Sequence, residues 1–216
     1  MAYGKSGSSG PRLPISAISY LPIYAQLPND KVSLHPYNQE TDEPYLHEIL
    51  KIICNDEGNS YPFTDMSTLD LFRSYYTTHD TFVAKIDGKA VGAFYVKPNF
   101  PGRSGHICNG GFIVHPDARG KRIATFLGYC FRFLARDLGY EASFFNLVYA
   151  SNVASVKLWR RFGFTEVGVI PKAGKLKGSD GKEFYSDAIQ MHCDFSEHDY
   201  EGQETPEWAN SKYSKC

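Results

Sequence analysis

A basic turn between a short apolar run and a long amphipathic segment is the part of this sequence best suited to chemistry. The apolar run is 112–114, Pro116 interrupts it, and the turn that follows reads Arg-Gly-Lys-Arg over 119–122. A helix that begins here presents free backbone amides and the positive end of its dipole, which together bind anions. The pattern therefore predicts a diphosphate site at 119–124. An ordinary strand-to-helix connection with solvated basic residues is the alternative, because short glycine-containing motifs are weak evidence.

An amphipathic helix has to hold this site in place. From Ile123 to Leu138 the apolar residues recur at spacings of three and four, which puts them on one helical face. Gly139 suits the end of that helix, since glycine adopts the left-handed conformation at low cost. The expected order is a strand, a tight basic turn and a long helix. In open sheets, ligands bind at such strand ends.

A second strand and helix follow, and they carry two asparagines. Residues 143–150 form an apolar run that contains Asn146, and Asn152 is suited to cap a helix that Gly163 ends. A buried amide has to satisfy its hydrogen-bonding groups. Asn146 is therefore either a structural link between strands or a contact to substrate, and Asn152 is first of all a helix cap.

The remaining elements are expected around this centre. The pattern of segments predicts an α/β protein with a mixed central sheet of about six or seven strands and helices on both faces. One domain should span 31–195, between a flexible arm at 1–30 and an acidic tail at 196–216. The other segments expected are a strand at 32–34, helices at 41–56 and from 67, a hairpin at 81–97, strands at 106–115, 164–170 and 184–195, and a loop at 172–182.

The composition argues against several classes of protein. The 216 residues carry a net charge of −1, so no global basic field attracts nucleic acid or an anionic membrane. The five cysteines show no CxxC spacing, which argues against a zinc site or a disulfide framework, and we expect no metal. No apolar run is long enough to span a bilayer. A cytoplasmic location fits these features, and a mitochondrial one is the alternative because residues 1–29 contain no acidic side chain.

Two blocks of the sequence together resemble the GNAT-type N-acetyltransferases. The first follows that family's pattern V-x-P-x-x-[RQ]-x-x-G-x-[GA] from Val114 to Ala124. The second has an asparagine, an alanine, an apolar–aromatic pair and then Gly-Phe, matched here by Asn152, Ala154, Leu158, Trp159, Gly163 and Phe164. The resemblance covers about 32–195 and implies direct transfer of an acetyl group from acetyl-CoA to an amine.

Two residues depart from the family pattern. Arg122 stands where the family has glycine, which crowds the anion site unless its side chain points outward. Trp159 stands where many relatives have a tyrosine that protonates the departing thiolate, and an indole N–H is no useful acid. The thiolate would then take its proton from another group or from water.

Three segments are more closely similar to the fungal acetyltransferases that detoxify L-azetidine-2-carboxylic acid, an analogue of proline. They are FYVKPNFPGRSGHICNGGFIV, FFNLVYASNVAS and GVIPKAGKL. The resemblance implies that Asn146 and Asn152 serve catalysis and that Asn109 binds the substrate. We also expect Glu57 at the substrate, and Phe94 in a small apolar pocket for the ring.

Acetyl-CoA is the cosubstrate that the resemblance implies. A backbone amide near Phe112 or Ile113 would stabilise the oxyanion. The acceptor nitrogen has a pKa of roughly 8 or above, so a base should help, and Glu57, His106 and His115 are candidates. The residues implied to bind acetyl-CoA are Phe112, Ile113, Val114, Arg119, Gly120, Lys121, Arg122, Ile123, Ala124 and Asn152.

Two other functions stay open at this point. The acceptor could be another amino acid, a polyamine or a peptide N-terminus, although a polyamine site should offer several carboxylates and the strand ends here are poor in them. A non-catalytic sensor of acyl-CoA is the third hypothesis, given Arg122 and Trp159. The partners expected are a small-molecule amine and, from the resemblance alone, a second copy in a homodimer.

Overall fold

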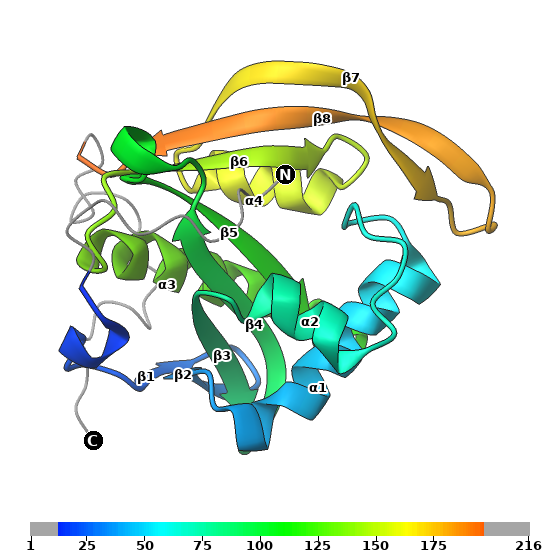
Figure 1. The fold of residues 1–216 in the computed structure, drawn as a ribbon. Coiled ribbons are helices and arrows are strands. Elements are labelled where there is room, and N and C mark those ends of the chain that lie inside the picture. Colours follow the sequence, from blue (N-terminus) through cyan, green and yellow to red (C-terminus); the bar gives the residue numbers. More distant parts are fainter. Residues whose placement is uncertain (1–12, 197–216) are drawn as a thin grey trace.

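Residues 13–196, the part of the chain that this computed structural model describes, fold around an eight-stranded sheet (Figure 1). The strands lie in the order β1-β2-β3-β4-β5-β6-β8-β7, and the β5–β6 pair is parallel whereas the other pairs are antiparallel. The sheet thus has more strands than the six or seven expected. The strands are β1 (Ile23–Gln26), β2 (Lys31–Pro36), β3 (Asp80–Ile86), β4 (Lys89–Pro98), β5 (Ile107–Val114), β6 (Ala142–Tyr149), β7 (Thr165–Lys177) and β8 (Glu183–Asp194).

Helices cover both faces of the sheet, as the segment pattern predicts. The helices are α1 (Gln39–Lys51), which continues into a π-helical segment at Ile52–Glu57, α2 (Leu69–Tyr76), α3 (Ile123–Asp137) and α4 (Val153–Arg161). Neighbouring residues of β4 point to opposite faces, so Ala93 packs with α1 and α2 while Phe94 packs with α3 and α4. No helix within 13–196 is long and apolar enough to cross a membrane.

The two central strands part soon after they begin to pair. β5 and β6 each have eight residues, but their parallel pairing extends over two positions, Ile107 with Ala142 and Cys108 with Ser143. Beyond Cys108 the strands diverge, and Figure 1 shows β6 and β8 lying apart from β4 and β5. The divergence opens the middle of the sheet at the strand that leads into α3.

Part of the arm expected to be loose is instead built into the fold. The described segment from Leu13 on contains β1, which pairs with β2 through a turn closed by the amide of Leu27 and the carbonyl of Asp30. Ala25 and Leu27 are buried, because their apolar side chains reach the edge of the core that α3 covers. Residues 1–12 and nearly all of the expected acidic tail lie outside the described part of the chain.

The prediction of a loop at 172–182 is wrong for most of that segment. β7 continues to Lys177 and pairs with β8, including Lys175 with Tyr185 and Leu176 with Phe184. Glycine and lysine are depleted in strands, so local composition indicates a loop here. The backbone of the neighbouring strand overrides that preference, and the turn is confined to the residues between β7 and β8.

The first long helix, expected at 41–56 with Thr41 or Asp42 as its N-cap, begins earlier, at Gln39. Asn38 caps it, accepting hydrogen bonds from the amides of Glu40 and Thr41. Asp42 is instead buried and forms an ion pair with Lys85.

Candidate active site

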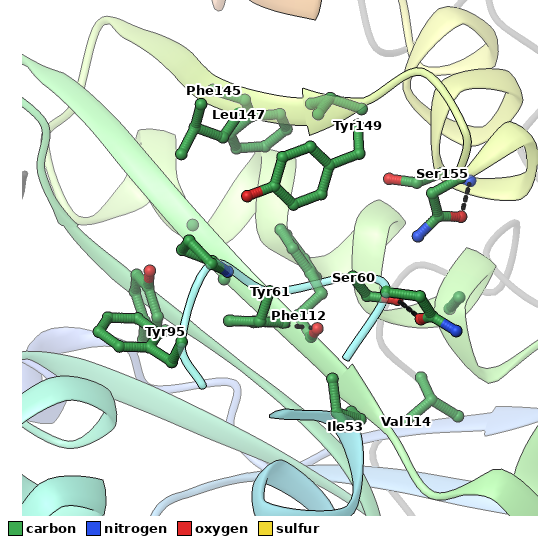
Figure 2. A pocket seen from close by; sticks show the side chains of 18 of the residues that line it. Ile53, Ser60, Tyr61, Tyr95, Phe112, Val114, Phe145, Leu147, Tyr149 and Ser155 are labelled. Carbon is green, nitrogen blue, oxygen red and sulfur yellow. Dashed lines mark hydrogen bonds between the residues drawn. The ribbon is translucent and has the colours of Figure 1, made fainter. Parts of the chain in front are cut away.

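A cavity of about 1830 Å³ occupies the gap between β5 and β6. Figure 2 shows that its side chains come from the segment after α1, from β4 and β5 on one side, and from β6 and α4 on the other. The helix α2 with the residues that follow it, the start of α3 and the turn between β7 and β8 complete the lining. The elements that the sequence pattern places around the basic turn therefore enclose one continuous space.

One edge of β5 presents its backbone to this cavity. Two hydrogen bonds, from His115 N to Val91 O and from Asn99 N to Ile107 O, fix which residues of the β4–β5 ladder are bonded pairs. Bonded and non-bonded pairs alternate in an antiparallel ladder, so the amides and carbonyls of Gly110, Phe112 and Val114 point away from β4. Because β6 has diverged, this edge is open to an extended ligand, except that the Tyr61 hydroxyl donates to Phe112 O at 3.1 Å.

The N-terminus of α3 lines the cavity near the C-terminal end of β5. Gly120 and Arg122 both adopt the left-handed conformation, with φ of 76° and 64°. No side chain caps the helix and its first turn contains no acidic residue. Such an end leaves backbone donors for an anion, and Arg119 and Arg122 line the cavity beside it. These features fit a diphosphate group.

Arg119 also makes a bidentate ion pair. Its two terminal nitrogens donate to the carboxylate oxygens of Glu57 at 2.6 and 2.9 Å. The pair joins the segment after α1 to the start of the α3 turn. Glu57 therefore neutralises a cation expected to bind phosphate, and its carboxylate does not line the cavity.

Three asparagines from three segments meet across the gap where β5 and β6 part. Oδ1 of Asn99, just after β4, accepts hydrogen bonds from Nδ2 of Asn146 at 2.6 Å and from Nδ2 of Asn109 at 3.0 Å. Nδ2 of Asn99 donates back to Oδ1 of Asn146 at 3.3 Å. All three side chains line the cavity. The gap thus has three fixed, uncharged amides along one wall.

The comparisons with known proteins agree with this geometry. The model of the acetyltransferase (GNAT) family matches residues 45–164, more than half of the chain. The chain belongs to the GNAT family. The N-acetyltransferase aca1 of Schizosaccharomyces pombe is 49% identical over 142 residues, which are 64% of this chain and 61% of aca1.

Solved structures of GNAT proteins share the fold. A GCN5-related N-acetyltransferase from Kribbella flavida aligns with a TM-score of 0.69 and 27% identity, over 76% of this chain and 97% of its own. A GNAT-superfamily phosphinothricin acetyltransferase from Sinorhizobium meliloti, solved in complex with acetyl-CoA, aligns with a TM-score of 0.65 and 19% identity, over 85% of this chain and 99% of its own. The fold and the family resemblance expected from the sequence are both confirmed.

The two departures from the GNAT pattern have clear structural settings. Arg122 adopts the left-handed conformation, which favours glycine, and its exposed side chain lines the cavity. Trp159 is buried and donates its indole N–H to the hydroxyl of Ser155 at 3.1 Å. Its ring packs on Phe112 and Phe145, so it serves as part of the cavity wall.

Most residues expected at the site line the cavity, and some do not. Those that line it are Asn109, Asn146, Asn152, Phe112, Val114, Arg119, Gly120, Arg122, Ile123 and Ala124. Phe94 is fully buried in the core between Phe82 and Phe112, while its neighbour Tyr95 faces the cavity. Outside the lining are Glu57, Phe94, Ile113, Lys121, His106 and His115.

Sequence reasoning missed Asn99 and Lys97. Both lie at the end of β4 and line the cavity, although each is at least nine-tenths buried. Asn99 falls just before a Pro-Gly loop, where an asparagine is expected to shape a turn. The signal that could have found them is the odd-numbered alternation of Tyr95, Lys97 and Asn99, which puts polar groups on one face of an apolar strand.

Proposed function

We propose that this protein is an acetyl-CoA-dependent N-acetyltransferase whose acceptor is a small cyclic imino acid of the L-azetidine-2-carboxylate type. The observation that carries the proposal is the gap between β5 and β6, which has an uncapped basic helix end at one side and a wall of three asparagines at the other. Five residues of extended strand, roughly 17 Å, separate Asn109 from Val114. The similarity to aca1, an N-acetyltransferase, supports the same reaction class.

The residues around α3 would hold acetyl-CoA, which supplies the activated acetyl group. The first-turn amides at Ile123 and Ala124 receive the diphosphate, with Arg119 and Arg122 beside them. The open edge of β5 pairs with amides of the extended arm of the cosubstrate, as an added strand would. Tyr61 has to release Phe112 O if that carbonyl takes part.

The backbone amide of Phe112 is the better of the two expected oxyanion donors. Phe112 belongs to the set of β5 residues whose N–H and C=O point into the gap, whereas Ile113 bonds toward β4. A fixed donor aimed at the place where negative charge develops stabilises the transition state without reorganisation. The side chain of Ile113 is also buried, on the face of the sheet that α1 and α2 cover.

The asparagine wall would position the acceptor. Asn109 and Asn146 are each held by Asn99, so their remaining amide groups have fixed directions. Amide donors and acceptors orient a small polar substrate without adding charge. Asp70 is the one carboxylate from the described residues that lines the cavity, and its side chain is 96% exposed. This scarcity of anions disfavours a polyamine acceptor.

Proton transfer needs groups other than the expected ones. The indole of Trp159 is committed to Ser155 and cannot serve as an acid. Tyr149 lines the cavity, and burial raises the pKa of its phenol, so it stays protonated and is suited to donate to the departing thiolate. None of the three expected bases, Glu57, His106 and His115, lines the cavity, so another group, water or binding as the free amine has to account for the deprotonated acceptor nitrogen.

The experiment is CoA release from acetyl-CoA with parallel acceptors: L-azetidine-2-carboxylate, proline, 4-hydroxyproline, spermidine and a peptide. Turnover confined to the cyclic imino acids supports the proposal. Turnover with only spermidine or the peptide overturns the proposed acceptor but supports the proposed reaction, N-acetylation. If acetyl-CoA binds but no acceptor is acetylated, the proposal of an enzyme is overturned and the hypothesis of an acyl-CoA sensor is favoured.

A further inference from the structure

A buried lysine faces the cavity without an anion beside it. Lys97, on β4, is 5% exposed and lines the cavity. Its Nζ lies 4.4 Å from the centre of the Tyr95 ring and 4.8 Å from the centre of the Tyr75 ring. Within residues 13–196, no carboxylate comes within ion-pair distance of it. By contrast, the half-buried Lys85 forms an ion pair with Asp42, with its Nζ 2.6 Å from a carboxylate oxygen.

An ammonium in this position has an incomplete set of partners. Burial takes the charge out of water, which lowers the pKa of Lys97 to about 8. The faces of Tyr75 and Tyr95 attract the cation, but aromatic rings satisfy none of its three N–H donors as an oxygen would. Buried charges are generally paired, so the cavity side of Lys97 is suited to an anionic group.

The same wall holds the groups proposed to position the acceptor. Lys97 is directly opposite Asn109 in the β4–β5 register, and side chains of such pairs project from the same face. Asn99, two residues along the strand, points to that face as well and binds both Asn109 and Asn146. One cation and three amides therefore lie together where β5 and β6 part.

We propose that Lys97 binds the carboxylate of the acceptor, with the amide of Asn109 beside it, and so restricts the enzyme to amino or imino acids. The inference rests on the proposed function and gives it a determinant of specificity. A carboxylate completes the hydrogen bonds of the ammonium and neutralises it, as a charge-assisted pair. The acceptor is then held by its acid group at Lys97, and its nitrogen extends toward Phe112.

The decisive experiment compares two acceptors that differ only in the acid group, L-azetidine-2-carboxylate and its carboxamide. In Lys97→Met, kcat/KM for the acid falls by roughly 10- to 100-fold, while kcat/KM for the carboxamide changes by less than about threefold. Lys175→Met is the control, because Lys175 forms an exposed ion pair with Glu183 away from the cavity. Equal losses for both acceptors would overturn the proposal and indicate a base or a folding role for Lys97.

A second measurement uses the unmutated protein and needs no turnover. Selective NMR observation of the Lys97 side chain follows its pKa with CoA present, first alone and then with each acceptor. A bound carboxylate raises that pKa, and the carboxamide leaves it unchanged. No change with the acid overturns the proposal even if the acid is acetylated. A raised pKa without acetylation supports the carboxylate site and counts against the proposed enzyme.

Discussion

Asn99 and Asn146 exchange two hydrogen bonds across the gap where β5 and β6 part. Nδ2 of Asn146 donates to Oδ1 of Asn99 at 2.6 Å, and Nδ2 of Asn99 donates back to Oδ1 of Asn146 at 3.3 Å. The backbone pairing of β5 and β6 has already ended at Cys108 and Ser143. The side-chain pair therefore connects the two halves of the sheet at the cavity and fixes the direction in which Asn146 faces it.

Asn99→Ala should impair the acceptor site more than the site for acetyl-CoA. The change removes three hydrogen bonds among partly buried amides, those that Asn99 makes with Asn109 and Asn146, which costs about 1–3 kcal/mol of stability. We expect kcat/KM for L-azetidine-2-carboxylate to fall roughly tenfold or more. The KM for acetyl-CoA should change less than about twofold. Steady-state kinetics with each substrate varied in turn make the comparison.

Asn38→Ala is the matched control for that prediction. Asn38 caps α1 away from the cavity, and losing such a cap costs about 1 kcal/mol, a similar loss of stability. Both variants should melt a few degrees below the unmodified protein, since about 1 kcal/mol shifts the Tm of a domain of this size by roughly 2–4 °C. If Asn38→Ala impairs the acceptor as strongly as Asn99→Ala does, the effect comes from folding alone.

Glu57→Gln should leave the chemical step nearly unchanged. Glu57 is occupied by Arg119 in a bidentate pair and lies outside the cavity lining. The change frees Arg119 for phosphate, so the KM for acetyl-CoA should fall by roughly two- to fivefold while kcat stays within about threefold. A general base would show a 10²- to 10⁴-fold loss of kcat. Glu166→Gln, which breaks the Arg160 pair remote from the cavity, should alter neither constant.

The sequence predicts those parts of the site that local pattern determines. The strand, basic turn and helix around Gly120 have distinct periodicities and turn residues, and Asn152 does cap α4 through the amide of Ser155. An asparagine within an apolar strand needs a hydrogen-bond partner, which predicts that Asn146 has one. These features depend on residues close together in the chain, so their spacing carries the information.

The remaining features depend on contacts between distant segments. The partner of Asn146 is 47 residues away, and that of Glu57 is 62 residues away. No local spacing identifies either pair. Phe94 and Tyr95 illustrate the same limit, because the face of β4 that meets the cavity depends on where β5 and β6 part. The continuation of β7 is decided by its pairing with β8.

Arg122→Gly should make the protein more stable. Arg122 has φ of 64°, a conformation that costs a residue with a side chain about 1–2 kcal/mol. Glycine loses roughly 0.5–1 kcal/mol through the greater entropy of the unfolded chain, so a net gain of about 0.5–1 kcal/mol remains. We expect Tm to rise by roughly 1–4 °C in thermal unfolding. The KM for acetyl-CoA should rise, because a cation beside the diphosphate site is lost.

Arg122→Ala separates the two effects of that substitution. It removes the same charge but keeps a Cβ in the left-handed conformation, so the KM should rise without a gain in Tm. A lower Tm for Arg122→Gly than for Arg122→Ala would contradict the account of backbone strain. An unchanged KM in both variants would show that the Arg122 side chain does not assist the diphosphate.

The pH dependence of kcat/KM should show the titration of Lys97. Burial lowers the pKa of Lys97 to about 8, so the ammonium that binds a carboxylate is present below pH 8 and is lost as the pH rises through that value. The ionisable groups that face it are Tyr75 from α2 and Tyr95 from β4; burial raises both pKa values, to about 12 for Tyr95, so both stay neutral in this range. The acceptor nitrogen has the opposite trend, because it reacts only when deprotonated.

These opposing titrations give a profile that differs between acceptors. For L-azetidine-2-carboxylate, log kcat/KM should rise with unit slope up to about pH 8 and then level off, since deprotonation of the acceptor is offset by loss of charge at Lys97. For the carboxamide, the rise should continue through pH 8 to the pKa of the nitrogen itself. Lys97→Met should show that uninterrupted rise with the acid as well. A break near pH 8 that persists in Lys97→Met with the acid as acceptor would assign the titration to another group.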